Sequence, residues 1–240
     1  YDGKPYTMPS QNQFRTWIEN AQKQEYANDN SSRQVDPVFM KKLPKKGKIL
    51  SKHTATNGYT EYLLSNGIKV SARQSDIEPN RLTINMFRMG GRSLYPDTDA
   101  PTLQFLGSVV KESGAADFDF LTLEKKRRGK ALRVVPYIDD EEEGVKGVCV
   151  ASDLKTWLQI MYLYLTNPRK DKAIFHNMIS KQQSMLRNRN ASPNVTYNDS
   201  LRIAVYGERK RTQPLTADRM NEVSFDRIYQ IYNERFGNLA

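Results

Sequence analysis

The chain has 240 residues, of which 38% are hydrophobic, so it can bury one sizeable core with appendages or two small ones. Its formal net charge of +10 favours an anionic partner, but the basic clusters contain no alternating aromatic residues for stacking on bases. We therefore expect no nucleic-acid partner and keep a basic nucleic-acid-binding domain only as the weaker alternative. No stretch reaches the roughly 18 apolar residues of a membrane span. The single Cys149 excludes an internal disulfide.

Residues 1–58 differ in composition from the rest of the chain. Ser10 is a suitable N-cap for a helix that extends to about Tyr26. The helix has one apolar face, formed by Phe14, Trp17, Ile18 and Ala21. A polar run interrupted by prolines follows it. Because one helix and an extended arm can bury little surface, we predict that residues 1–58 form a linker that packs on neighbouring domains.

The pattern changes at Tyr59, where the predicted domain begins. Tyr62–Leu64 and Ile68–Ala72 flank an Asn-Gly turn, which predicts a tight hairpin. Leu82–Met89 alternates apolar and polar residues, as a half-buried strand does, and ends at Gly90-Gly91.

Later elements follow from capping residues and periodicity. They are helices over 101–112 and 119–128, strands over 131–138 and 144–151, and helices that begin near Ser152, Lys170, Ser192 and Ser224. This order lacks the βαβ alternation of a parallel sheet. It predicts an α+β fold, an antiparallel sheet with helices packed on one face, preceded by a helical linker.

Four other features favour structural roles. The acidic run 139–143 is expected to be a solvated loop, and the basic run 125–130 the outer side of a short helix whose Leu121 and Leu123 face inward. The stripe 157–164 is expected to be core or a domain interface. Cys149, in an alternating strand, is expected to be a buried and unreactive thiol.

Several spaced motifs resemble one known family. They are YLLSNGIKV (62–70), GGRSLYPDTD (90–99), VVKESG (109–114), LEKKRRGK (123–130) and VVPYIDDEEEG (134–144). Together they resemble a unit of the M16 (pitrilysin/insulinase-like) zinc metallopeptidases, over about residues 59–238. The likeness is to a non-catalytic unit, the third of four, with the preceding inter-half linker of a long bacterial member. It implies a domain over 59–240 that is cut short at its C-terminal end.

The resemblance also implies where a catalytic site would be. Catalytic units of the family carry His-x-x-Glu-His on the helix after the Gly-Gly loop, and a later helix supplies a Glu ligand. Here the matching positions are Gln104, Gly107 and Ser108, and the later helix over 172–186 has no carboxylate. We therefore expect no catalytic, cofactor or metal site in this segment. We also expect Gln104 and Ser108 to share a helix face that looks onto the sheet or a shallow cleft.

The family suggests a role in a larger protein. A parent enzyme of this type would be a zinc metalloendopeptidase with zinc in another domain, in the periplasm or cell envelope. This unit would contact the other domains of its chain and help to enclose a peptide substrate. The alternative is a wholly inactive homologue that serves as a partner or scaffold subunit. A His-x-x-Glu-His sequence upstream of residue 1 would distinguish the two.

Overall fold

The computed structural model describes residues 9–23, 38–187, 189, 192–207 and 209–237. The chain divides into two compact units, residues 1–36 and 37–240. The second unit therefore includes residues 38–58, which were predicted to belong to the linker.

The first unit contains helix α1 (Gln11–Lys23). Its start confirms the predicted cap: the backbone N–H of Gln13 donates to Ser10 Oγ at 3.3 Å, and that of Ser10 donates to Gln13 Oε1 at 2.8 Å. This reciprocal pair satisfies two N–H groups that the first helical turn leaves without partners. The predicted end at Tyr26 lies outside the described residues.

The second unit begins with a small antiparallel sheet in the order β1-β2-β3. Its strands are β1 (Ile49–Thr54), β2 (Thr60–Leu64) and β3 (Lys69–Ala72). The predicted hairpin is confirmed, and Gly67 in its turn has a φ of +83°. Strand β1 was not predicted, because its residues alternate weakly and follow a proline-rich run.

The larger sheet is also antiparallel, in the order β4-β6-β5. It consists of β4 (Arg81–Met89), β5 (Leu132–Ile138) and β6 (Glu142–Val150). Ile84 of β4 and Val134 of β5 both lie opposite Gly147 of β6. Cross-strand partners share a face. The register therefore brings the apolar residues of the three strands together on one side.

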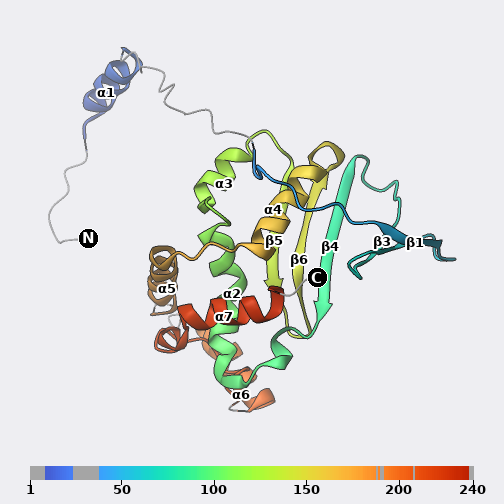
Figure 1. Ribbon diagram of the computed structural model, residues 1–240. Coiled ribbons are helices and arrows are strands. Elements are labelled where there is room, and N and C mark those ends of the chain that lie inside the picture. Colours follow the sequence, from blue (N-terminus) through green and yellow to red (C-terminus); the bar gives the residue numbers. More distant parts are fainter. Residues whose placement is uncertain (1–8, 24–37, 188, 190–191, 208, 238–240) are drawn as a thin grey trace. The chain divides into compact units, whose positions relative to one another are not determined.

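Helices cover that apolar side of the sheet (Figure 1). Helices α2 (Ala100–Ser113) and α4 (Leu154–Thr166) contact its strands directly. The unit also contains the helices α3 (Phe120–Lys126), α5 (Lys172–Arg187), α6 (Pro193–Tyr206) and α7 (Phe225–Phe236). Fully buried side chains from α2, α4 and α7 fill the core, among them Leu103, Val109, Trp157, Ile228 and Ile231. Short 3₁₀ turns over 91–94, 97–99, 151–153 and 219–222 link these elements. The structure confirms the predicted α+β class with helices on one face.

Helix α3 differs in part from its prediction. Leu123 is buried as expected, but Leu121 is 69% exposed instead of facing inward. Lys126, within the basic run, is buried instead, with its ammonium 4.7 Å from the centre of the Phe118 ring and 5.5 Å from that of Phe39. Phe39 is itself buried and ties the arm over 38–48 to the domain. The sequence pattern missed this because the covering aromatic residue is far away in the chain.

Candidate functional site

The three positions that match the family's zinc motif lie on α2. Gln104 and Ser108 are one turn apart and share a helix face, as predicted. Both are exposed, however, because α2 packs through the opposite face, which carries Leu106 and Val110. The shared face therefore points to solvent, and the expectation that it looks onto the sheet is wrong.

Gly107 instead lies against the backbone of strand β5. A Cβ atom built on Gly107 would lie 3.1 Å from the backbone oxygen of Pro136, which is tighter than ordinary contact. A side chain at position 107 therefore requires the helix or the strand to shift. In the family's catalytic units this position holds the general base, whereas here it is a packing contact.

The donor set at these positions does not suit zinc, which proteins bind through imidazole, thiolate or carboxylate. Position 104 offers a neutral amide, position 108 a hydroxyl and position 107 no side chain. Helix α5, which would supply the carboxylate ligand, has no Asp or Glu. Within the described residues, no group of three or more His, Cys, Asp or Glu side chains is placed to hold a metal.

The remaining candidate residues stand apart from one another. His53 is exposed on β1, and His176 is exposed on α5 with its ring 5.5 Å from that of Phe175. Cys149 is buried, as predicted, and burial raises the pKa of its thiol. A raised pKa lowers the thiolate fraction, so the thiol is a poor nucleophile at neutral pH.

A buried cluster of charges lies at one end of the larger sheet. Glu143 is only 1% exposed, and its Oε1 accepts from Arg88 Nε at 2.9 Å and from Arg235 Nε at 3.0 Å. Its Oε2 accepts from the backbone N–H of Gly91 at 2.5 Å. The expectation of a solvated loop over 139–143 is therefore wrong for Glu143. This residue lies directly opposite Arg88 in the β4–β6 register and so points into the protein.

The Gly-Gly loop after β4 fits closely against the β5–β6 turn. The backbone N–H groups of Gly90, Arg92 and Ser93 donate to carbonyl oxygens of residues 139–141 at 2.7–2.8 Å. Gly91 has a φ of +57°, and a Cβ there would lie 2.4 Å from the backbone oxygen of Asp139. Only glycine allows this approach.

Arginines from the C-terminal part of the domain hold the rest of this loop. Arg211 binds Asp97 at 2.9 Å, and Arg227 binds Asp99 at 2.7 Å. The hydroxyl of Tyr95 donates to Glu234 at 2.9 Å, and burial followed by this bond raises its pKa to about 12. The motif GGRSLYPDTD thus has a structural role, because its contacts connect β4, the β5–β6 turn and α7.

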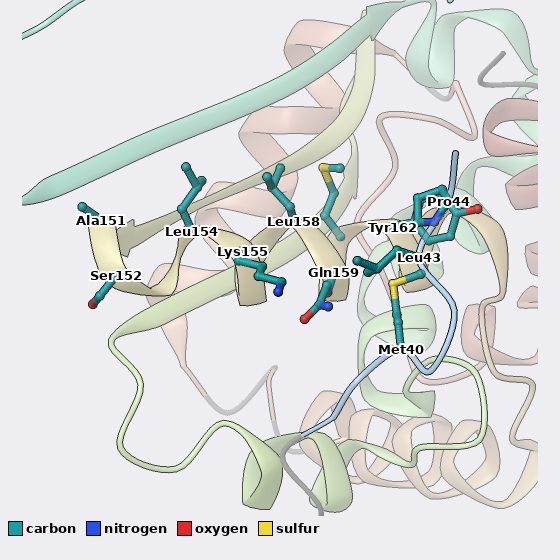
Figure 2. A pocket seen from close by; sticks show the side chains of 11 residues that line it. Met40, Leu43, Pro44, Ala151, Ser152, Leu154, Lys155, Leu158, Gln159 and Tyr162 are labelled. Atoms are coloured by element: carbon teal, nitrogen blue, oxygen red, sulfur yellow. The ribbon is translucent and has the colours of Figure 1, made fainter. Parts of the chain in front are cut away.

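An apolar groove of about 570 Å³ lies between the arm and α4 (Figure 2). Met40, Leu43 and Pro44 form one wall, and Leu158 and Tyr162 are among the residues of α4 that form the other. The buried side of α4 carries Trp157, whose Nε1 donates to the backbone oxygen of Arg133 at 2.8 Å. Lys155 is the groove's only charged lining residue. Such a groove can bind apolar surface, and its lining includes no His, Cys, Asp or Glu side chain.

No protein-family model matches the chain. Over 115 residues it is 30% identical to the protein named "Probable zinc protease PqqL" of Haemophilus influenzae, a match that covers 48% of this chain and 12% of that protein.

Solved structures share the fold, among them two bacterial proteins. The periplasmic protease PqqL from Escherichia coli matches with a TM-score of 0.69 at 16% identity, over 83% of this chain and 22% of that one. A peptidase M16 inactive domain from Pseudomonas fluorescens matches with a TM-score of 0.57 at 13% identity, over 73% of this chain and 42% of that one. The chain has the fold of an M16-like peptidase unit, and the resemblance to such units seen in its sequence is confirmed. It spans about an eighth of the length of the Haemophilus protein.

Proposed function

We propose that this chain is a non-catalytic unit of a larger M16-type zinc metalloendopeptidase, the third of four, with the preceding linker over residues 1–58. The proposal rests on the residues that occupy the zinc-motif positions of helix α2. Gln104 and Ser108 are not metal ligands of the family's type, and Gly107 packs against Pro136 of β5. Helix α5 has no acidic residue to complete a metal site.

In this proposal the unit forms part of the wall around an enclosed peptide and part of the interface between the two halves of the parent protein. The sheet face away from the helices supports this role. It exposes Phe87 and Met89 of β4, which are 57% and 65% exposed. Beside them, the hydroxyl of Tyr137 donates to Glu142 at 2.8 Å, and the ammonium of Lys146 lies 4.0 Å from the centre of the Tyr137 ring. A surface of mixed apolar and polar groups can contact a polypeptide without selecting one sequence.

The parent's zinc, its proteolytic activity and its location also belong to this proposal. One structurally similar protein is a periplasmic protease, which supports a periplasmic location for the parent. In the described part of this chain, no helix is long and apolar enough to cross a membrane. The chain's expected contacts are the other domains of the parent and its peptide substrate.

A zinc-loading experiment tests the proposal. The untagged chain is stripped of metal with a chelator, reloaded with zinc, passed through a desalting column and analysed for bound metal. We expect far less than one zinc per chain and no chelator-sensitive cleavage of a casein substrate. Stoichiometric zinc together with chelator-sensitive cleavage would refute the non-catalytic assignment.

The upstream sequence of the parent then distinguishes a peptidase from a scaffold. A His-x-x-Glu-His helix in an earlier unit would support the peptidase. Its loss from every unit would favour the inactive scaffold subunit.

A further inference from the structure

Most of the net positive charge of the chain lies in one small region of the second unit. Residues 41–73 contain eight Lys or Arg residues and a single acidic residue, Glu61, and so carry +7 of the total of +10. This region, called here the basic sheet, comprises the arm from Lys41 and strands β1, β2 and β3. Figure 1 shows these strands projecting beyond β4, away from the helices.

The cations of the basic sheet lack the acidic partners that cations have elsewhere in the domain. Arg88, Arg211, Arg227 and Arg235 each contact a carboxylate at 2.5–2.9 Å. Within the described residues, none of the eight cations of the basic sheet forms an ion pair. All eight belong to exposed residues, which are Lys41, Lys42, Lys45, Lys46, Lys48, Lys52, Lys69 and Arg73. Their fields therefore add at the surface without local neutralisation.

The basic sheet also lacks a core of its own. No residue of β1, β2 or β3 is buried, and Ile49 and Leu50 are 62% and 63% exposed. A three-stranded sheet needs a packed hydrophobic face for independent stability. A partner that contacts the basic sheet can thus bury apolar side chains and neutralise lysines at the same time.

We propose that the basic sheet binds an acidic segment of the polypeptide substrate. This inference rests on the proposed function and adds to it the charge of the preferred substrate segment. A polypeptide fits better than a nucleic acid, since residues 41–73 contain only two Phe, Tyr or Trp residues for base stacking, Tyr59 and Tyr62. Lys52 lies 5.8 Å from the centre of the Tyr62 ring, and Arg73 lies 5.8 Å from that of Tyr59. An extended acidic peptide can also hydrogen-bond along a strand edge, a common mode of peptide recognition.

The test measures binding of a fluorescein-labelled oligoglutamate peptide to the whole chain by fluorescence anisotropy, with an oligolysine peptide as the charge control. We expect the acidic peptide alone to bind, and its binding to weaken about tenfold or more between about 0.05 M and 0.2 M salt, because exposed charges are screened over roughly 10 Å. Equal binding of both peptides, or no binding of the acidic one at low salt, would overturn the proposal.

Matched charge reversals locate the surface. The double variant Lys46→Glu with Lys48→Glu should lose about tenfold or more in affinity, a change of about 1.4 kcal/mol. The control, Lys125→Glu with Arg128→Glu, changes charge equally at exposed residues of the other basic run and should lose less than about twofold. Circular dichroism spectra establish that both variants are folded. An equal loss in both would show that only net charge matters and would refute the assignment to the basic sheet.

Two further probes exclude other partners. Tighter binding of a single-stranded oligonucleotide, or binding to phosphatidylserine vesicles, with the same loss in the Lys46/Lys48 variant, would overturn the polypeptide assignment. These measurements do not involve zinc or cleavage. A failed peptide titration therefore leaves the proposed function intact, whereas zinc loading refutes that function without changing the titration.

Discussion

Replacing Glu143 by Ala tests whether the buried charge cluster holds the domain together. Its carboxylate is 1% exposed and is shared by two guanidinium groups and one backbone N–H. Removing it leaves Arg88 and Arg235 close together without a counter-charge and orphans the N–H of Gly91. Breaking a buried ion pair in this way costs about 3–5 kcal/mol. For a domain of this size, such a loss lowers the melting temperature by roughly 6–20 °C.

The assay is urea unfolding followed by far-ultraviolet circular dichroism. Glu141→Ala is the matched control, because it removes the same group from an exposed position of the same acidic run. The control should change the free energy of unfolding by less than about 0.5 kcal/mol. Glu143→Gln should fall between the two, since the amide oxygen still accepts hydrogen bonds but the charge is lost. If Glu143→Ala costs no more than Glu141→Ala, the cluster does not stabilise the domain and the argument from burial fails.

Two further predictions concern helices α2 and α3. Gly107→Ala should destabilise the domain by about 1–3 kcal/mol, because the added methyl group overpacks against Pro136. In an ordinary helix the same change is favourable by about 1 kcal/mol. A gain in stability against urea would show that the helix or the strand shifts easily to accept the methyl group. Asp119 accepts from the backbone N–H of Thr122 at 2.6 Å, and this bond holds the pKa of its carboxyl below the usual value. The cap therefore stabilises the fold at neutral pH and is lost as the pH falls through this lowered pKa. Asp119→Ala should cost about 1 kcal/mol at pH 7 and close to nothing once the pH lies well below this lowered pKa. The exposed Asp117→Ala should be neutral at both pH values, and unfolding curves with a pH-independent loss would contradict this reasoning.

Local sequence signals determined most of the secondary structure. Ser10 and Asp119 start helices through their own side chains, and Gly67 allows its turn through a positive φ. The alternation over 82–89 predicted β4, because every second side chain of a strand points to the same face of the sheet. Such features depend on neighbours within a few residues, so they can be recognised without the fold.

The absence of His-x-x-Glu-His from residues 104–108 could also be recognised from residue identity alone. Gln104, Gly107 and Ser108 are visible as non-ligands in the sequence. Their surroundings were not visible. The exposure of Gln104 and the contact of Gly107 with Pro136 follow from the direction in which α2 packs on β5, and this direction depends on the whole core.

Only the tertiary structure decided which charged residues are buried. Glu143 and Lys126 lie within runs of like charge that are typical of solvated surface. Glu143 is nevertheless covered by side chains more than 50 residues away, and Lys126 by aromatic side chains from outside its helix. Lys126 is enclosed by Phe118 and Phe39, and Glu143 by Arg88 and Arg235. A charge can be buried only where its partners converge in space, and that convergence depends on the fold and not on the spacing of residues along the chain.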